Sequence, residues 1–424
     1  MEQQTENNII EWIGEIPDNW KISKIGELYS YKNIKVNDED YPPLSVTKMG
    51  ILPQLENAAK SDAHDDRKLV NTGDFVINSR SDRRGSCGIS SLDGSVSLIN
   101  IVLSPKSILN SDYYNWLFHT PQFADEFYKW GHGIVDDLWT TNWQNMKNII
   151  IPIPSLEEQK SIANFLNKKC AFIDSLINAE NTIRDKLIEY KLSLITEIVT
   201  KGLNNNVKFK DTDIEWIGKI PNHWNLIRLK YVVTKKAQYG ANCEPEQDYN
   251  KFDYRYVRIT DIDDNASLKD EIVYLSAEDA EGFVLNEGDI LFARSGATVG
   301  KSYLYNKNDG KCCFAGYLIR YVPNKKKLNP KYLLYFTFSN LYIEWIKIVA
   351  TQSTIQNVSA NKYDNLILPL PNINEQKEII DYLDKKCAPI NLLIIEKEKV
   401  ISKLEEYKNS LIFEYVTGKR EVQK

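Results

Sequence analysis

Residues 148–177 read NIIIPIPSLEEQKSIANFLNKKCAFIDSLI, and residues 365–394 read NLILPLPNINEQKEIIDYLDKKCAPINLLI. The two stretches are identical at 16 of 30 positions. Their offset of 217 residues persists further along the chain, where Glu189-Tyr190-Lys191 returns as Glu406-Tyr407-Lys408. The sequence therefore contains an internal duplication, and a fold assigned to one copy must also fit the other.

Each copy begins with a strand-like apolar run that contains two prolines, Pro152 and Pro154 in the first and Pro369 and Pro371 in the second. Proline forbids a helix there and marks the end of the run. A long helical pattern with heptad spacing follows, which is typical of a coiled-coil seam. The predicted seam consists of Leu166, Ile173, Leu187 and Leu194 with a companion row of Leu176, Ile183 and Tyr190, and, in the second copy, Leu383, Ile390, Leu404 and Leu411 with Leu393, Val400 and Tyr407.

A helix of about 40 residues is roughly 60 Å long, and a narrow apolar stripe along it needs a partner. The only other such stripe in the sequence is its own duplicate, so we expect the two helices to pair with each other. Tandem copies joined by an intervening domain can pair about a two-fold axis, which predicts an antiparallel coiled coil. Pro389, where the first copy has Phe172, predicts a kink or a restart of the second helix.

The other edge of the duplicated unit is IEWIGEIPDNW at residues 10–20, which returns as IEWIGKIPNHW at residues 214–224. Both edges are repeated while the interiors have diverged. The interiors mix short strands, turn signals and a few helices, which predicts two α+β domains related by a pseudo-two-fold repeat. The predicted boundaries are 1–155 for the first domain, 156–204 for the first helix, 205–372 for the second domain and 373–424 for the second helix.

Length and composition indicate a soluble protein with a core in each domain: the chain has 424 residues and a net charge of -5. No apolar run reaches membrane-spanning length and the N-terminus is polar, so we expect a cytoplasmic protein without contact to a membrane. The six cysteines lack zinc-binding spacing, and no metal site is predicted. The negative charge excludes a protein that coats phosphates indiscriminately but allows a local basic surface.

Catalytic patterns are absent from the sequence. Residues 296–302, GATVGKS, resemble a phosphate-binding loop, but only three residues separate the glycines where such a loop has four. We interpret this segment as a turn that presents Arg294 and Lys301. A dinucleotide fingerprint, a zinc-protease motif and a nucleophile elbow are all missing. The sequence therefore predicts a protein that is not an enzyme.

Binding residues are easier to find, in polar loops that follow buried strands. Arginine forks suit guanine edges and phosphates, and amides suit adenine edges. A solvated surface loop is the alternative interpretation for each of these residues. The candidates for binding nucleic acid are Lys48, Arg80, Arg83 and Arg84 in the first domain, and Arg294, Ser295, Lys301, Gln352, Gln356 and Asn357 in the second.

Three short motifs resemble one protein family. Pro152-Ile153-Pro154 with Glu158-Gln159, their second copy Pro369-Leu370-Pro371 with Glu375-Gln376, and the ending Tyr415-Val416-Thr417-Gly418-Lys419 flank two divergent domains. This organisation resembles the specificity subunit of type I restriction-modification systems over essentially the full chain.

The resemblance implies that each domain is a target recognition domain that reads one half of a bipartite DNA sequence. It further implies that the helices are a spacer and a docking surface for two methyltransferase subunits, joined by restriction and translocase subunits. S-adenosylmethionine, ATP and magnesium would then act on those partners, and this chain would hold no cofactor. The alternative is a tandem protein- or glycan-binding protein with a coiled-coil spacer.

Overall fold

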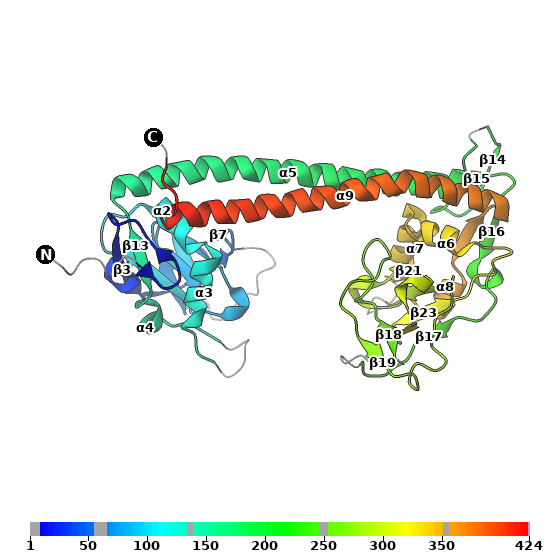
Figure 1. Ribbon diagram of the computed structural model, residues 1–424, viewed down its shortest axis with the longest axis horizontal. Helices are drawn as coiled ribbons and strands as arrows, with labels where there is room; N and C mark the ends of the chain where they lie inside the picture. Colours follow the sequence, from blue (N-terminus) through cyan, green and yellow to red (C-terminus); the bar gives the residue numbers. More distant parts are fainter. Residues whose placement is uncertain are drawn as a thin grey trace. The chain divides into compact units, whose positions relative to one another are not determined.

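The computed structural model describes residues 9–54, 66–133, 139–204, 206–245, 253–350 and 357–422. The chain forms two compact units: unit 1 comprises Met1–Asn181 and Lys399–Lys424, and unit 2 comprises Thr182–Glu398. Two long helices, α5 (Leu156–Lys201) and α9 (Ile373–Val416), begin where the sequence predicted (Figure 1). Each helix contributes one part to unit 1 and the other part to unit 2, so the units cut through both predicted helical segments.

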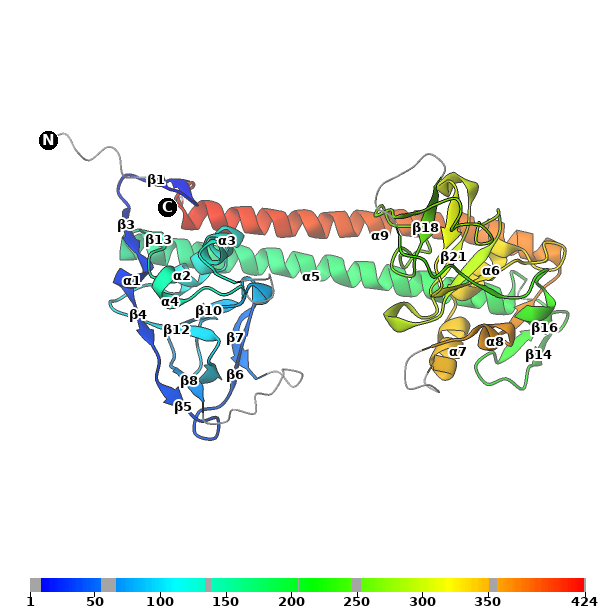
Figure 2. The ribbon, with the colours of Figure 1, turned by 90° about the horizontal axis from the view of Figure 1, so that it is seen from below.

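The described residues of unit 1 form mainly short strands, with four short α-helices and one helical turn, in addition to its parts of α5 and α9. Its elements are β1 (Ile9–Ile10), β2 (Gly14–Glu15), β3 (Lys21–Lys24), α1 (Ile25–Leu28), β4 (Tyr29–Lys32), β5 (Lys35–Val36), β6 (Leu44–Thr47), β7 (Gly50–Pro53), β8 (Arg67–Val70), β9 (Phe75–Asn78), β10 (Cys87–Ile89), β11 (Gly94–Ser97), β12 (Asn100–Pro105), α2 (Ser111–Phe118), α3 (Pro121–Lys129), α4 (Trp143–Met146) and β13 (Ile150–Ile153) (Figure 2).

Unit 2 repeats the edge strands and the four-stranded sheet of unit 1 around a longer interior. Its elements are β14 (Phe209–Asp211), β15 (Lys219–Pro221), β16 (Asn225–Arg228), β17 (Gln238–Tyr239), β18 (Tyr254–Val257), β19 (Tyr274–Leu275), β20 (Ile290–Ala293), β21 (Ser302–Leu304), β22 (Cys312–Phe314), β23 (Leu318–Tyr321), α6 (Pro330–Thr337), α7 (Asn340–Ala350), α8 (Ala360–Asp364) and β24 (Ile367–Leu370).

The two units share the topology of their four-stranded sheet, which confirms the predicted α+β repeat. Each has a four-stranded sheet, ordered β10-β9-β12-β4 in unit 1 and β21-β20-β23-β17 in unit 2. In both, a Gly-Asp turn leads into the fully buried strand, β9 or β20, and the residue pairs Phe75–Leu103 and Ile290–Tyr321 mark equivalent positions. The proline-containing strands β13 and β24 pair with β3 and β16 in a separate two-stranded sheet of each unit.

The short helices begin at residues that satisfy their free N–H groups. Asn110 caps α2 by accepting a hydrogen bond from Tyr113 N, and Asn329 caps α6 by accepting one from Lys331 N. Pro330 occupies the first helical position of α6, where its missing N–H costs nothing. Because these capped helices present buried aromatic residues such as Tyr114 and Phe336 to the sheet, they form the centre of each core.

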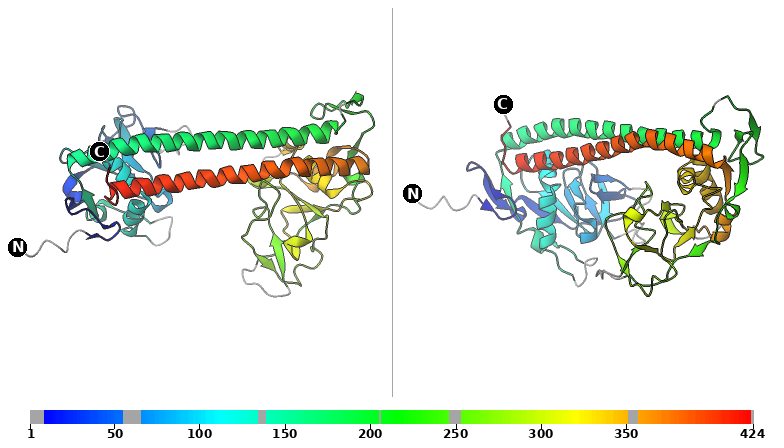
Figure 3. Two further views of the ribbon diagram at one scale, coloured as in Figure 1. Left: turned by 45° about the horizontal axis from the view of Figure 1, so that its top comes forward. Right: turned by 45° about the vertical axis from the view of Figure 1, so that its right-hand side comes forward.

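The long helices run antiparallel within each unit, as the duplication predicted. In unit 1, Phe165 packs on Tyr415 with ring centroids 4.4 Å apart, and Asp174, further along α5, accepts a hydrogen bond from Lys408, which lies earlier in α9. In unit 2 the last turns of α5 share a core with the first turns of α9. In Figure 3 helix α5 is green and helix α9 changes from orange to red, and the chain runs along the two helices in opposite directions.

The structure differs from the prediction in the companion row of the seam. Leu166, Ile173, Leu383, Ile390 and Leu411 are buried, and Leu187, Leu194 and Leu404 are half-buried, as expected of the first row. The row that accompanies it lies four residues further on, and its buried members are Cys170, Ile198, Cys387, Ile394, Ile401 and Tyr415. The predicted companions are exposed, with Ile183 at 42 % and Tyr190 at 57 %, except for Val400, which is half-buried.

The physical reason is that a heptad seam alternates steps of three and four residues, and both flanks of the first row carry apolar side chains. Periodicity alone does not decide between the flanks. The packing of α5 and α9 against the α+β domains decides which flank is buried, because Cys170 belongs to the core of unit 1 and Cys387 to the core of unit 2.

Pro389 lies inside α9, which continues through it from Ile373 to Val416. The predicted restart of the helix therefore does not occur. The two helices end differently in sequence but alike in conformation, because Gly202 and Gly418 both adopt a positive φ, at 75° and 74°. This is the left-handed position that glycine occupies after a helix.

Two repeated motifs, distant in sequence, meet at the start of each long helix. Glu158 accepts a hydrogen bond from the indole N–H of Trp20 at 3.2 Å, and Glu375 accepts one from Trp224 at 2.9 Å. The end of the other copy's helix completes each contact. A Cβ built on Gly418 would lie 3.1 Å from the Trp20 ring, and one built on Gly202 would lie 3.1 Å from the Trp224 ring.

The same exchange between copies occurs at two buried tyrosines. Tyr113 of the first copy donates a hydrogen bond to the carbonyl of Val416, and Tyr332 of the second donates to the carbonyls of Val199 and Pro369. Each unit is thus closed by the helix end of the other copy. The repeated edges of the sequence build this frame, and the divergent interiors remain free to differ.

Candidate nucleic-acid interface

The loop between β9 and β10 carries three of the predicted binding residues of unit 1. It contains a helical turn at Ser81–Arg83. The segment around Thr140 holds the loop through its backbone, because Arg80 forms a β-bridge with Thr140 and Ser81 N donates a hydrogen bond to the Trp139 carbonyl at 3.0 Å. Trp139 donates its indole N–H to the Tyr128 carbonyl at 2.8 Å. The loop is therefore a supported platform at the end of a buried strand.

Every arginine of this loop faces a carboxylate. Arg80 lies 3.3 Å and Arg83 3.8 Å from oxygens of Asp82, and Arg84 forms an ion pair with Asp125. The guanidinium of Arg84 also lies over the Tyr128 ring, 5.9 Å from its centroid. These pairs are solvent-exposed and therefore contribute little to stability, so phosphates can displace the acids at small cost.

Lys48 lies at the tip of the β6–β7 hairpin, next to the exposed Met49. This hairpin packs closely on β10: a Cβ built on Gly88 would come within 2.9 Å of the Gly50 Cα. Strand β10 follows the arginine loop in the chain and contacts the β6–β7 hairpin. Lys48 and the arginines therefore belong to neighbouring segments of unit 1.

The equivalent loop of unit 2, between β20 and β21, has the same construction. Ser295 forms a bridge with Asn357, as Arg80 does with Thr140, and precedes a helical turn at Gly296–Thr298. Arg294 N donates to the Tyr317 carbonyl at 3.0 Å, and Val358 N donates to the Arg294 carbonyl at 2.8 Å. The structure thus brings Arg294, Ser295 and Asn357 together, whereas Gln352 and Gln356 lie outside the described residues.

Lys301 follows the turn and reaches another loop. Its ammonium lies 2.7 Å from Asp264 and 3.3 Å from the Ile262 carbonyl. Lys301 lines a pocket of about 340 Å³ with the aliphatic side chains of Val299, Ile343 and Ile346. The P-loop interpretation has no support here, because the glycine segment forms a three-residue turn that leads into strand β21, whereas a P-loop opens a helix.

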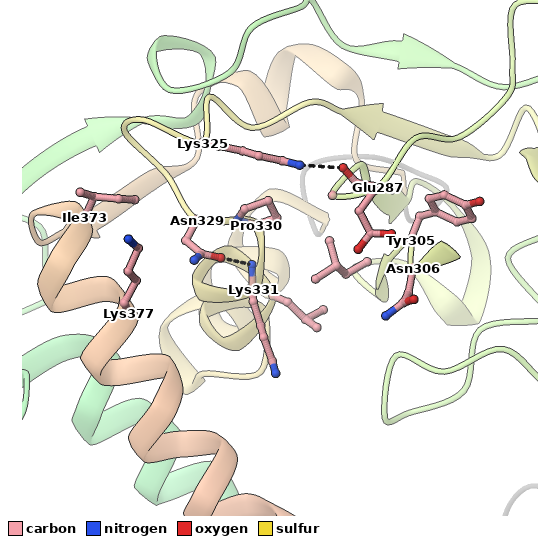
Figure 4. A pocket seen from close by; sticks show the side chains of 12 residues that line it. Glu287, Tyr305, Asn306, Lys325, Asn329, Pro330, Lys331, Ile373 and Lys377 are labelled. Carbon is pink, nitrogen blue, oxygen red and sulfur yellow. Dashed lines mark hydrogen bonds between the residues drawn. The ribbon is translucent and has the colours of Figure 1, made fainter. Parts of the chain in front are cut away.

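A second cationic feature of unit 2 lies at the opposite end of β20. A pocket of about 530 Å³ lies there, and Lys325, Lys331 and Lys377 are among the residues that line it. Figure 4 shows these side chains. Lys325 donates to the Glu287 carbonyl at 2.9 Å, and Lys331 pairs with Asp384 at 2.6 Å. Because Glu287 precedes β20 and Arg294 follows it, this pocket is separate from the predicted binding loop.

Metal and thiol chemistry find no site in the part of the chain that the structure describes. No group of three or more His, Cys, Asp or Glu is arranged there to hold a metal ion. Burial raises the pKa of Cys312 and of Cys313 to about 12, so both thiols stay protonated at neutral pH. None of the described helices is long and apolar enough to cross a membrane.

Sequence reasoning missed the aromatic residues that support the loops. Tyr128 and Trp139 in unit 1 and Tyr239 in unit 2 lie beneath or beside the arginines, and the Arg294 guanidinium is 4.9 Å from the Tyr239 ring centroid. Tyr239 precedes Arg294 by 55 residues and belongs to no repeated motif. The sequence therefore holds no signal that joins the two.

The chain matches a family model described as the type I restriction modification DNA specificity domain, over residues 17–187 and 221–406. Its relatives include the type I restriction enzyme MjaVIII specificity subunit of Methanocaldococcus jannaschii, which is 24% identical over 100% of this chain and 98% of the relative. The EcoKI specificity subunit of Escherichia coli is 24% identical over 48% of this chain and 44% of its own length.

A solved structure described under complex assembly and conformational transition of the type I R-M system has the same fold. Its matching chain aligns with a TM-score of 0.67 at 15% sequence identity, over 96% of this chain and 100% of that one. At this identity the likeness supports the architecture of the two units and their helices.

Proposed function

The chain belongs to the type I restriction-modification DNA specificity family, and from that premise we propose how its residues divide the work. Members of this family are non-catalytic subunits that recognise a DNA sequence and associate with methyltransferase and restriction subunits. The observation that carries the proposal is the contrast between repeated and divergent parts. The repeated parts build the frame, and the divergent loops carry the cations.

In the proposed division, unit 1 reads one half of a bipartite target and unit 2 reads the other. The loops at Arg80–Arg84 and Arg294–Lys301 occupy equivalent positions after β9 and β20 but differ in charge and in the partners of their cations. Phosphate contacts supply affinity without regard to sequence, whereas side chains at base edges select it. Two units with different loops therefore select two different half-sites.

We further propose that two methyltransferase subunits dock on the long helices, one on each unit. Large apolar side chains remain exposed on both pairs of helical segments, among them Tyr407 at 53 % in unit 1 and Tyr190 at 57 % in unit 2. These residues are repeat mates, as are Leu176 and Leu393, which are also exposed. Exposed apolar patches of this kind mark protein interfaces, and duplicated patches suit two copies of one partner.

The experiment replaces each tyrosine by lysine and measures the mass of the assembled complex. Because both side chains are exposed, the substitutions leave the fold intact. We expect the Tyr407→Lys variant and the Tyr190→Lys variant each to retain one methyltransferase subunit, and the double variant to retain none. Lys169→Glu, at another exposed helix position, is the control. Unchanged stoichiometry in the double variant would place the docking surface elsewhere.

The cofactors follow the partners in this proposal. S-adenosylmethionine is expected on the methyltransferase subunits, and ATP and magnesium on the restriction and translocase subunits, with none on this chain. We also propose that the chain works in the cytoplasm, where those partners meet DNA.

A further inference from the structure

Arg294 differs from the other predicted binding cations in how its charge is held. Arg80, Arg83, Arg84 and Lys301 each face a carboxylate. Among the described residues, no carboxylate lies within ion-pair distance of Arg294, and none accepts a hydrogen bond from its side chain. Its Nε is buried without a partner. Because Nε is enclosed, the donors left for a ligand are the two terminal NH2 groups, which bond none of the described residues.

The guanidinium is nevertheless held in one orientation. It lies over the Tyr239 ring, 4.9 Å from the centroid, which is within the range of a cation–π contact. Tyr239 is fixed in turn, because its hydroxyl accepts a hydrogen bond from Ala360 N at 3.0 Å. The Arg294 backbone is bonded on both sides, to Tyr317 and to Val358. Stacking on a fixed ring orients the planar fork before any ligand arrives.

The segment that carries Tyr239 is itself tightly packed. A Cβ built on Gly240 would lie 2.3 Å from the Phe314 carbonyl oxygen, and one built on Gly316 would lie 1.9 Å from Asn242 Oδ1. Gly240 faces backbone atoms and therefore requires glycine, whereas Gly316 faces the end of the Asn242 side chain. Ala241 N donates to the Phe314 carbonyl at 2.9 Å, and Gly316 N donates to the Ala241 carbonyl at 2.7 Å. The platform under Arg294 is a rigid part of the sheet edge rather than a loop.

Unit 1 has no equivalent of this pair. In the strand register, Phe75 corresponds to Ile290, so Ser79 takes the place of Arg294. Val102 and Arg320 are equivalent in the same register, and their partners on the neighbouring strand are Lys32 and Gln238. The residue after Lys32 is Asn33, which therefore takes the place of Tyr239. Arg84 of unit 1 also lies over a ring, that of Tyr128, but it is paired with Asp125. Among the described residues of these loops, an arginine that stacks on a ring and faces no carboxylate therefore belongs to unit 2, and its effect on recognition must be confined to one half of a bipartite target.

We propose that Arg294, oriented by Tyr239, reads a guanine in the half-site bound by unit 2. An arginine fork donates two hydrogen bonds to O6 and N7 of guanine in the major groove, a pattern that the other bases do not offer. Phosphate binding needs a positive charge but does not need a guanidinium plane of fixed orientation. The acid-paired arginines of unit 1 could therefore bind phosphate as well as Arg294 could. The inference rests on the proposed division of the target between the units.

The experiment maps the methylated sites of the complex formed by this chain with its methyltransferase subunits, on a library of DNA with randomised sites. For the wild type we expect one guanine-requiring position in the half-site of unit 2. In the Arg294→Ala and Arg294→Lys variants, preference for guanine at that position should fall about 5- to 150-fold, as the loss of a bidentate base contact implies. The other half-site should stay unchanged. Tyr239→Leu should weaken the same position only.

The lysine variant separates base reading from phosphate binding, and it retains the size and charge of the side chain should the alanine variant fail to fold. Lys301→Ala serves as a matched phosphate-type control, with uniformly weaker binding and a smaller salt dependence. A motif unchanged in Arg294→Lys, or a loss spread evenly over all sequences, would overturn the inference. A wild-type complex that methylates no bipartite motif would instead overturn the proposed function.

Discussion

Replacing residues 26–145 by the interior of a relative that recognises another sequence should change one half of the methylated target and leave the other half as it was. The graft removes the arginine loop, the β6–β7 hairpin and the segment around Thr140, which hold the candidate base contacts of unit 1. The effect is large, because each mismatched base pair costs about 1 to 3 kcal/mol and a half-site contains several.

The junctions of this graft lie beside each other in the fold, which is why the exchange should be tolerated. Ile25 N donates to the Ile149 carbonyl at 2.9 Å, directly outside the exchanged segment, and β3 remains paired with β13. The reciprocal exchange of residues 230–362 uses equivalent junctions, since Leu229 N donates to the Leu366 carbonyl at 2.9 Å. Sequencing of methylated sites is the measurement. A change in both halves after either exchange would contradict the assignment of one half-site to each unit.

The Gln376→Leu variant should lose about 3 kcal/mol or more of the free energy of unfolding, since each buried polar group left without a partner costs about 1 to 3 kcal/mol. Gln376 is fully buried. Its Oε1 accepts from Asn329 N at 2.8 Å, and its Nε2 donates to the carbonyls of Lys327 and Pro371, each at 2.9 Å. Leucine of similar size satisfies none of these three groups.

Gln159→Leu, its repeat mate, should cost less, because Gln159 bonds two backbone groups, Asn110 N and the Pro154 carbonyl. Gln144→Leu, at an exposed position, is the control and should change stability little. Urea titration of the three variants measures the difference. Equal midpoints for all three would show that the glutamine contacts do not hold the helices to the domains.

These contacts explain why the repeated residues are repeated. At the start of each long helix, the glutamate accepts a hydrogen bond from a tryptophan and the glutamine accepts one from the backbone N–H of the asparagine that caps α2 or α6. The pair therefore joins segments that lie far apart in sequence. Duplication in the sequence was sufficient to predict two α+β units, the starts of both long helices and their antiparallel pairing. It could not reveal the partner of Glu158 or Gln159, because one sequence contains no record of long-range contacts.

The seam shows where periodicity reaches its limit. Leu166 and Leu383 were predicted correctly from heptad spacing, but Ile183 and Leu393 lie on the exposed flank. Apolar residues on both flanks of the first row serve different purposes in the structure, one set packing between the helices and the other remaining on the surface. A count of apolar positions cannot separate a buried contact from an exposed apolar surface.

The binding loops show a similar limit. Their position after a buried strand was predictable from the Gly-Asp turn and the apolar run that follows it. The charge partners were not predictable: Arg84 meets Asp125 and Lys301 meets Asp264 across loops of unrelated sequence. The positions of the acids determine which cations are already paired. The difference between Arg294 and the other candidate cations is therefore visible only in the structure.

The most direct measurement of the central claim, that two dissimilar units of one chain each select half of a DNA target, is the adenine methylation pattern of the host genome with and without this chain. We expect a bipartite motif, two short specified sequences separated by unspecified bases, that disappears when the chain is removed and returns when it is restored. A methylation pattern that is unchanged by its removal, or a lost motif that is one continuous sequence, would contradict the account.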